Sequence, residues 1–397
     1  MRRKLLLTCL RTTLALCLSL GSTAALAATV WYVDAANGDD QNNCKSVQTS
    51  CATIGHSISL ASSGDAVMIA PGTYKENLTI NISLKLMGSG ATATIIDGAR
   101  QRRVVSIFNT TAIVGLSKVT IKNGVASSGG GILNWGTLTL TNSILSANIA
   151  ASQSSAAGGG IYNSGKLTIT NSTLSGNSGT SNYLYGGAIY NTGTLTITNS
   201  TLSANTSYGY IGGGGGGIYN SSGSVTIINS TLSGNSAHAS GGGGIYNSVG
   251  SVAINNATLS GNTAVGYKGG GIFVAKGATV TVQNSIVANS TTAGNCYGML
   301  TSHGYNLSSD TSCALRGFNG PGDRNNIGPL LGPLQNNGGP TFTHALLSGS
   351  QAIDKGNPSG CTDGKGHRLT TDQRGQPRPD KEDTIGCDMG AYERQTD

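Results

Sequence analysis

The sequence contains little charge, and its long central part contains no acidic side chain at all. Only 10% of the residues are charged, and neither Asp nor Glu occurs between Asp97 and Asp310. Glycoside hydrolysis normally uses two carboxylates that flank the scissile bond, and calcium-assisted polysaccharide lyases need clustered carboxylates to hold the cation. The central part of the chain therefore cannot assemble either kind of site.

Recognisable catalytic motifs are missing as well. The sequence has no G-x-S-x-G nucleophile motif. It has no P-loop or dinucleotide fingerprint, because its glycine clusters precede predicted strands and not helices. We therefore expect no catalytic residue, no cofactor and no metal site. The scattered basic side chains are expected to aid solubility, with a lyase base within Arg100–Arg103 as the alternative. Acidic residues also gather near the C-terminus, where turn bonding and ion pairing are favoured over a calcium or catalytic site.

The first residues have the pattern of an export signal. Met1–Lys4 is basic, Leu5–Leu20 is apolar and Ala25–Ala27 fits an A-x-A cleavage site, which together predict a secretory signal peptide at residues 1–27. Its removal takes away four basic residues and no acidic one, so the net charge falls from +7 to +3. We infer no nucleic-acid partner from so small a charge. No later stretch is apolar enough to predict a transmembrane span.

Cysteine usage agrees with export. Six cysteines remain beyond residue 27, as the sequence-local pairs Cys44/Cys51, Cys296/Cys313 and Cys361/Cys387. Several pairings are possible for six cysteines. The local pairing is favoured because an exported chain meets an oxidising compartment and because each pair closes a short loop outside the repeats. Zinc binding is a poor alternative, since C-x-x-C spacing is missing and histidine is scarce.

Glycine is abundant, with 61 residues, but it follows a repeat. The string G-G-G-I, with small variations, and a second block such as L-T-I-T-N-S recur about every 28 residues, which indicates stacked units. The Ile of the first string lies at Ile132, Ile161, Ile189, Ile218, Ile245 and Ile272. Within each unit apolar and polar residues alternate with a period of two, as in a half-buried strand. The sequence therefore predicts an all-β fold, a right-handed parallel β-helix in which each unit is one coil.

Further rows of residues follow the same period. The predicted inward stacks include Ile161, Ile189, Ile218 and Ile245, and also Leu167, Leu195, Val225 and Val252. A row of asparagines, which tolerate left-handed turns, is predicted to bond through its amides from coil to coil. This row consists of Asn142, Asn171, Asn199, Asn229, Asn256 and Asn284.

Four parts follow from these patterns. We expect a signal peptide at 1–27, an N-terminal cap at 28–64, the β-helix at 65–295 and a C-terminal domain at 296–397, which drops the repeat and gains proline and charge. Cys51–Ser62 is predicted to form a short amphipathic cap, because the end of a β-helix is an exposed sheet edge. The C-terminal domain is expected to be loop-rich and to contain disulfides.

Three groups of residues resemble known families. The G-G-G-I and G-G-A-I strings resemble the repeats of pectin-lyase-like β-helix proteins and of chlamydial polymorphic outer-membrane proteins. Trp31–Asp34 and Pro71–Tyr74 are similar to the start of secreted bacterial β-helix proteins. The segments GPLQNNGGPTFTHALLSGSQAIDKGN, TDQRGQPRP and CDMGAYE resemble the choice-of-anchor Q domain of bacterial surface proteins. The resemblance implies export and surface display, leaves anchorage or release open, and implies no reaction.

Insertions between the repeats predict a binding edge. They follow Asn148, Asn177, Asn205, Asn235 and Asn262. Insertions at one point of each unit emerge on one edge of a solenoid, often its binding face. These loops carry Tyr183, Tyr185, Tyr208, Tyr210 and Tyr267. Tyrosine offers sugars or proteins an apolar ring and a hydroxyl, but these rings could instead pack back onto the edge.

Two outward rows have both structural and functional interpretations. Tyr162, Tyr190, Tyr219, Tyr246 and Phe273 predict a stacked ladder that stabilises the sheet, with a sugar platform as the alternative. The T-x-T pairs Thr139/Thr141, Thr168/Thr170 and Thr196/Thr198 resemble the arrays of ice-binding β-helices. This array breaks at Ile228 and Asn255, and threonine is in any case a frequent strand residue.

The leading hypothesis is a non-enzymatic β-helix protein, secreted or at the cell surface. It is expected to be a monomer that binds an extracellular polysaccharide or a surface protein through its loop-bearing edge. A polysaccharide lyase or hydrolase that acts on uronic-acid polymers is the first alternative. An ice-binding protein and a purely structural surface protein are minor alternatives.

Overall fold

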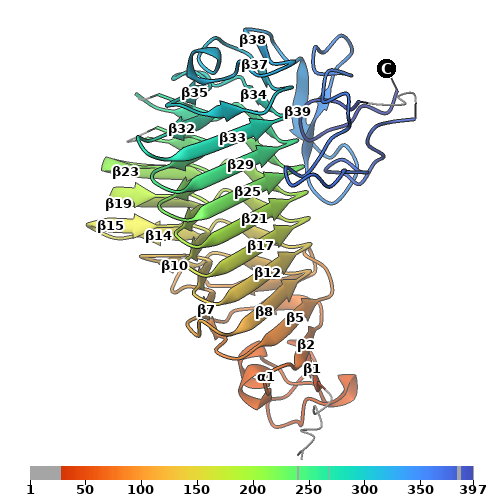
Figure 1. Ribbon diagram of the computed structural model, residues 1–397. Coiled ribbons are helices and arrows are strands. Elements are labelled where there is room, and N and C mark those ends of the chain that lie inside the picture. Colours follow the sequence, from red (N-terminus) through yellow and green to blue (C-terminus); the bar gives the residue numbers. More distant parts are fainter. Residues whose placement is uncertain (1–27, 239–240, 267, 382–385, 397) are drawn as a thin grey trace, which may run out of the picture.

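The computed structural model describes residues 28–238, 241–266, 268–381 and 386–396. Short parallel strands wind into a tall β-helix, and a strand-poor domain lies against its side (Figure 1). The predicted all-β solenoid is therefore confirmed. The predicted signal peptide at 1–27 and Tyr267 lie outside the described residues. Among the described helices, none is long and apolar enough to cross a membrane.

Three parallel sheets form the walls of the β-helix, and successive coils add one strand to each. Sheet 1 consists of β1 (Val30–Val33), β2 (Ala66–Ile69), β5 (Leu84–Gly88), β8 (Ile113–Ser117), β12 (Thr137–Thr141), β17 (Lys166–Thr170), β21 (Thr194–Thr198), β25 (Ser224–Ile228), β29 (Ser251–Asn255), β33 (Thr279–Gln283) and β36 (Thr301–Ser302). Sheet 2 consists of β3 (Gly72–Tyr74), β6 (Thr94–Asp97), β9 (Thr120–Lys122), β13 (Ile144–Ser146), β18 (Thr173–Ser175), β22 (Thr201–Ser203), β26 (Thr231–Ser233), β30 (Thr258–Ser260), β34 (Ile286–Ala288), β37 (Leu307–Ser308) and β38 (Arg324–Asn325). Sheet 3 consists of β4 (Leu78–Thr79), β7 (Val105–Ile107), β11 (Ile132–Asn134), β16 (Ile161–Asn163), β20 (Ile189–Asn191), β24 (Ile218–Asn220), β28 (Ile245–Asn247), β32 (Ile272–Val274) and β35 (Cys296–Tyr297).

The insertions form a fourth parallel sheet between sheets 2 and 3, which we call the fin. Its strands are β10 (Val125–Ala126), β14 (Ile149–Ala151), β15 (Ser155–Ala157), β19 (Ser178–Tyr185), β23 (Thr206–Gly214), β27 (Ser236–Ala237) and β31 (Thr263–Ala264). The fin projects from one side of the helix (Figure 1). The sequence predicted loops here because the insertions fall at one point of each repeat, yet each insertion pairs with its equivalent in the next coil.

The interior is built from stacks of identical positions. Ile161 pairs with Ile189 and Leu167 with Leu195, and all four side chains are completely buried. The other residues of the predicted inward stacks are also buried, as period-two alternation requires. The predicted core is therefore confirmed.

The asparagine ladder lies in different rows from the predicted one. The predicted row does hold the left-handed turns, with φ near 50° at Asn171 and its equivalents. The amide ladders are instead formed by two fully buried rows, Asn134–Asn163–Asn191–Asn220–Asn247 and Asn148–Asn177–Asn205–Asn235–Asn262. Asn142, Asn171 and Asn199 of the predicted row are not buried, and the buried Asn229 and Asn256 donate to carbonyls of the C-terminal residues Thr371 and Thr362. The amides of the two ladder rows are fully buried and find their partners in the equivalent amides of the neighbouring coils. In the predicted row one such bond occurs, from Asn284 to Asn256.

Both ends of the helix are closed. At the start, helix α1 (Ile54–Leu60) and the 3-10 helix η1 (Val47–Thr49) lie within the predicted cap, although β1 of the same region already belongs to sheet 1. At the far end the parallel pairing continues beyond residue 295, through β35 to β38, and includes the 3-10 helix η2 (Ala314–Arg316). The coils therefore persist after the G-G-G-I string has disappeared from the sequence.

The remaining C-terminal residues form a domain that packs beside the coils, which we call the tail. It contains the antiparallel pair β39 (Leu331–Gln335) and β40 (Thr343–Leu346). The Gln373 amide accepts a hydrogen bond from the Thr231 hydroxyl and donates to Thr201, and Asn229 donates to the carbonyl of Thr371. The tail thus covers the side of the middle and last coils, and it does not extend the stack (Figure 1).

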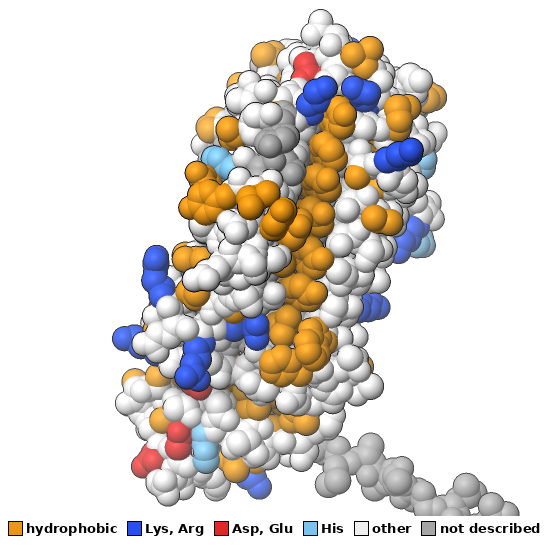
Figure 2. Space-filling model, turned by 90° about the vertical axis from the view of Figure 1, so that its left-hand side faces the viewer, with side chains coloured by type: hydrophobic (Ala, Val, Ile, Leu, Met, Phe, Trp, Pro, Cys, Tyr) orange, Lys and Arg blue, Asp and Glu red, His pale blue; other side chains and the backbone are white. Residues whose placement is uncertain are grey.

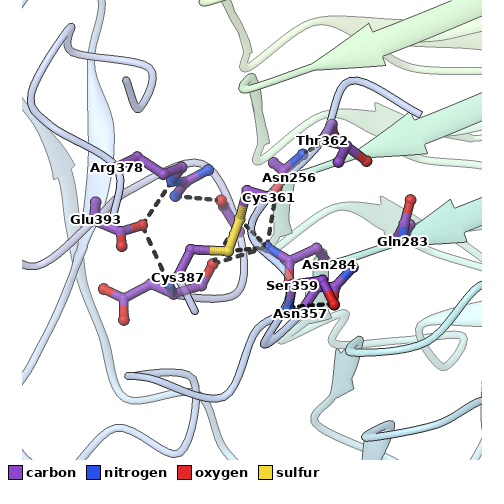
Figure 3. The surroundings of a disulfide bond; sticks show 12 residues. Asn256, Gln283, Asn284, Asn357, Ser359, Cys361, Thr362, Arg378, Cys387 and Glu393 are labelled. Atoms are coloured by element: carbon purple, nitrogen blue, oxygen red, sulfur yellow. Dashed lines mark hydrogen bonds and ion pairs between the residues drawn. A yellow bond between two sulfur atoms is a disulfide. The ribbon is translucent and has the colours of Figure 1, made fainter. Parts of the chain in front are cut away.

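Disulfides fix the regions outside the regular repeats. The three bonds are Cys44–Cys51, Cys296–Cys313 and Cys361–Cys387, which confirms the predicted pairing. Around Cys361–Cys387, the side-chain amide of Asn284 donates to the carbonyl of Asp388 (Figure 3). Nearby, the buried Arg378 pairs with Glu393 at 2.6 Å between Nε and Oε2.

Candidate functional site

An aromatic ladder runs along the outer surface of sheet 3. Its rings are Tyr162, Tyr190, Tyr219, Tyr246, Phe273 and Tyr297, with neighbouring centroids 4.5–5.6 Å apart and interplanar angles of 10–26°. Parallel register places equivalent residues above one another, so the rings stack along the helix axis. Figure 2 shows the resulting stripe of hydrophobic side chains along this face.

The stacking decides what the ladder offers to a ligand. Each of the four inner rings uses both faces on its neighbours, so solvent meets the ring edges and, at the tyrosines, the phenolic hydroxyl groups. Tyr219 is 9% exposed, and burial raises its pKa to about 12, so that its hydroxyl remains a neutral hydrogen-bonding group. The ladder thus stabilises the sheet, and it presents a row of hydroxyls instead of flat sugar platforms.

The fin forms a wall beside the ladder. The second half of β19 returns toward the helix, and its Leu184 packs with Ala150 and Ala156 in a small core. Tyr185 reaches the ladder, with its ring centroid 4.9 Å from that of Tyr219. Tyr183 lies two residues away and so faces the same side; it is 41% exposed. The fin therefore contacts the ladder at Tyr185, and tyrosines lie on both sides of this contact. We call the surface along the junction of the fin and the ladder the groove.

The predicted loop tyrosines do not share one surface. Tyr183 and Tyr185 face the groove, whereas Tyr208 contacts Tyr210 and His238, with centroids 5.3 and 4.8 Å away. Tyr208 lies in the first half of β23, where the chain runs away from the coils. It pairs with Thr180 in the corresponding first half of β19. These rings therefore lie on the opposite face and tip of the fin. Of the four predicted tyrosines that the structure describes, two therefore lie beside the ladder and the other two lie together elsewhere on the fin.

Two hollows with basic side chains lie along sheet 3, one at the C-terminal end of the ladder and one two coils before its first ring. At the C-terminal end a hollow of about 530 Å³ is lined by Lys268, Tyr297 and Arg316. At the N-terminal end a hollow of about 450 Å³ is lined by Arg102, Arg103 and Phe108. Both lie beside strands of sheet 3, so the groove has a basic group at each end.

Arg103 is held in place by the coil that follows it. Its Nε and Nη2 donate to the carbonyls of Ser128 and Gly129, and Nη1 donates to the hydroxyl of Ser106. Burial lowers the pKa of Arg103. Its neighbours Arg100 and Arg102 are exposed. Arg103 is therefore the member of Arg100–Arg103 that the fold positions.

Among the described residues, potential metal ligands gather at one place. Cys44, Cys51 and His56 have ligand atoms within 4.8 Å of one another. The two cysteines form a disulfide, which removes their thiolates as ligands. This group therefore offers a single imidazole to a metal ion.

The threonine pairs are aligned on the outer face of sheet 1. Thr139 pairs with Thr168 and that residue with Thr196, in full register. The array ends at Ile228 and Asn255, which are buried beside the tail; Gly364 lies against the amide of Asn255. The break in the threonine pattern thus coincides with the docking of the tail.

Three residues of the site were not predicted as functional: Tyr297, Lys268 and Arg316. Tyr297 follows Cys296 as the earlier tyrosines follow the inward Ile, so the ladder pattern contains a signal for it. Arg316 lies beyond the repeats, on η2, and no sequence period relates it to the ladder.

Comparison with known proteins assigns the class of the protein. Residues 103–312 match the family described as "Right handed beta helix region", over more than half of the chain. The protein belongs to this family of right-handed β-helix proteins. A solved structure of a rhamnogalacturonan lyase is similar, with a TM-score of 0.37 and 16% sequence identity, over 70% of this chain and 74% of that chain. So distant a likeness carries no argument about activity. No curated protein matches the sequence.

Proposed function

We propose that this β-helix protein is exported and binds an extended polysaccharide in the groove between the aromatic ladder and the fin, without cleaving it. The observation that carries the proposal is the pair of tyrosine-bearing walls, one from sheet 3 and one from the fin. Polar aromatic groups in a concave site are well suited to sugars, which combine apolar ring faces with hydroxyls.

The repetition of the groove supports a polymeric ligand. Equivalent ladder hydroxyls recur in four successive coils, from Tyr162 to Tyr246, and again at Tyr297 after the interruption by Phe273. Successive coils are about 4.8 Å apart, because that is the spacing of hydrogen-bonded strands. A ligand with a regular chemical repeat can meet several such positions at once, whereas a small molecule or a globular protein would use only one or a few. Several weak contacts along one chain then add to a useful affinity.

The sequence supports binding without cleavage. The ladder and the fin lie within the stretch between Asp97 and Asp310, which lacks acidic residues. Two carboxylates for hydrolysis or a calcium cluster for lyase chemistry therefore have no source there.

The position of the tail supports display of the groove at a surface. The tail resembles the choice-of-anchor Q domain, and it lies on the side of the helix opposite the fin (Figure 1). A chain held through its tail would leave the groove open to the medium. Cell-surface or secreted localisation is part of the proposal.

Binding and cleavage can be tested in one experiment. The purified protein is incubated with a panel of soluble and insoluble polysaccharides, and depletion of protein and new chain ends are both measured. We expect depletion by at least one polysaccharide and no new ends. Tyr183→Ala with Tyr185→Ala should raise the Kd about tenfold, whereas the matched pair Tyr208→Ala with Tyr210→Ala should leave it unchanged. Equal effects of the two pairs would overturn the groove as the site.

The alternative function is polysaccharide cleavage at the N-terminal end of the groove. The half-buried guanidinium of Arg103, held by hydrogen bonds in a hollow of about 450 Å³, favours this candidate. A lyase would release unsaturated ends from a uronic-acid polymer, and Arg103→Lys would abolish that release while circular dichroism stays native. A complete lack of new ends, with and without calcium, would exclude it.

A further inference from the structure

We propose that Lys268 and Arg316 form an anion-binding subsite at the C-terminal end of the groove, which takes a carboxylate or sulfate group carried by a sugar. The inference rests on the proposed function for the sugar, whereas the anion site itself follows from the geometry around Tyr297. In Figure 2 the hydrophobic stripe ends between basic side chains near the top of the molecule.

The two cations converge on a single ring. Lys268 Nζ lies 5.2 Å from the centroid of Tyr297, and the guanidinium carbon of Arg316 lies 5.1 Å from it. Both distances fall within the range of cation–π contacts, in which the ring quadrupole attracts the charge. Two positive charges that share one ring lie within about 10 Å of each other and repel. An oxyanion between them would relieve that repulsion.

Neither cation is neutralised within the protein. Among the residues that the structure describes, Lys268 and Arg316 form no ion pair with an acidic side chain. Asp310 is the acidic residue in this region of the sequence, and its carboxylate accepts hydrogen bonds from the backbone of Asn295 and Ser312. The Asp310 carboxylate keeps its charge but is held by these backbone donors, and among the described residues it forms no ion pair with Lys268 or Arg316.

The subsite is built on a rigid frame. The Cys296–Cys313 disulfide joins the residue before Tyr297 to the cap of η2, which carries Arg316. The hydroxyl of Ser312 also accepts a hydrogen bond from the backbone of Cys296 at 3.0 Å. The ring and the guanidinium are therefore held together before any ligand arrives, which lowers the entropic cost of binding.

The surroundings fit a sugar that carries an acidic group. The hollow has a volume of about 530 Å³, and Ser312 and Thr292 contribute hydroxyls to its lining. Pockets of about 300–1,000 Å³ accommodate small ligands. The guanidinium can bind a carboxylate or sulfate through two parallel hydrogen bonds, while the hydroxyls and the edge of Tyr297 contact the sugar.

The test uses small sugars first and a polymer second. Glucuronate and glucose 6-sulfate are titrated into the isotope-labelled mature protein, with glucose as the neutral control, and arginine side-chain NMR signals are followed. We expect saturable shifts of the Arg316 Nε–H signal with one or both acidic sugars and none with glucose. The identity of the active sugar distinguishes a carboxylate from a sulfate ligand. A lack of saturable shifts with both acidic sugars would overturn the proposal.

The polymer experiment separates this proposal from the proposed function. Lys268→Gln with Arg316→Gln should raise the Kd for an acidic oligosaccharide at least tenfold and leave that for a neutral oligosaccharide unchanged. The matched control is Lys276→Gln, a substitution of an exposed lysine on a turn outside this hollow. If all oligosaccharides bind the double variant as they bind the parent, the subsite is refuted and the groove stands. If small acidic sugars bind but no polymer does, the groove is refuted and the subsite stands.

Discussion

The buried amide ladder predicts that Asn177 contributes far more to stability than the turn asparagine of the same coil. The Oδ1 atom of Asn177 accepts hydrogen bonds from both the side-chain amide and the backbone N–H of Asn148. Its Nδ2 atom donates to Asn205 Oδ1 and to the carbonyl of Leu145. Asn177→Ala removes all four hydrogen bonds without disturbing the apolar stacks.

The magnitude follows from counting the groups that lose their partners. Each hydrogen bond contributes about 1 kcal/mol net, and a buried donor without a partner costs about 1–3 kcal/mol. The backbone N–H of Asn148 is left without its acceptor, whereas the Asn148 amide keeps a hydrogen bond to Ile121. We therefore expect Asn177→Ala to lower the free energy of unfolding by about 3–5 kcal/mol.

The matched control is Asn171→Ala in the turn of the same coil. Asn171 has φ of 49° and is partly exposed. Its replacement adds the strain of a left-handed alanine, about 1 kcal/mol. Both variants are compared with the parent by urea unfolding, followed by circular dichroism. Equal losses for Asn171→Ala and Asn177→Ala would refute the assignment of the ladder to the buried rows.

Three further predictions concern the tail, the fin and the N-terminal cap. Burial and, as the second cause, the charge of Glu393 raise the pKa of Asp388 to about 8. The folded state therefore keeps a proton that the unfolded chain releases near pH 4. The free energy of unfolding should consequently fall as the pH rises from about 4 to 8. Thermal melts should show this slope, and Asp388→Asn should flatten it. Gly213 lies in the fin with φ of 121°, and a Cβ there would clash with the carbonyl of Leu184. Gly213→Ala should therefore disrupt the fin and abolish polysaccharide binding, while the circular dichroism of the coils stays native. Gly176→Ala, which meets open space, should keep binding, and a loss in both variants would count against a folded fin. Glu76 accepts hydrogen bonds from the first two backbone N–H groups of α1. Glu76→Gln should therefore lower the free energy of unfolding by about 1–2 kcal/mol and speed amide hydrogen exchange in α1. Unchanged exchange would argue against this contact.

Much of the coil could be predicted because one residue pattern repeats. Alternation with a period of two identifies the inward Ile161 and the outward Tyr162 without any long-range information. The stacking of Tyr162 on Tyr190 then follows from the repeat length alone. Local patterning therefore determines the walls of the helix and the ladder.

The choice between asparagine rows could not be made from the period. Asn171 and Asn177 occur in the same block and recur at the same spacing, so both rows satisfy a coil-to-coil ladder equally well. What separates them is burial at the corner between sheet 2 and the fin, where Asn177 is enclosed and Asn171 is not. That difference arises only when the coil closes in three dimensions.

The fin and the tail depend on contacts that are distant in the sequence. The fin strands consist largely of alanine, glycine, serine and tyrosine, and they are stabilised by equivalent insertions one coil away. The tail joins Asn199 to Thr341 and Asn229 to Thr371, pairs that are each separated by 142 residues. The positions of the insertions recur with the repeat, but the pairing between insertions leaves no pattern in their sequences, and the contacts of the tail have no period. The sequence therefore predicted loops for the fin and did not place the C-terminal domain against the coils.

The exceptions in the threonine pattern also help to specify which coils the tail packs against. Successive coils are nearly identical in sequence. A domain that contacted only their threonine hydroxyls could therefore bind one coil away from its native position, a shift of about 4.8 Å along the helix. Ile228 and Asn255 interrupt the threonine column where the tail lies. Ile228 and Asn255 therefore distinguish the surfaces of their two coils from those of the other coils. With threonine at both positions, neighbouring coils would offer the tail more similar surfaces, and its position would depend more strongly on the contacts of Asn229, Asn256 and Asn284.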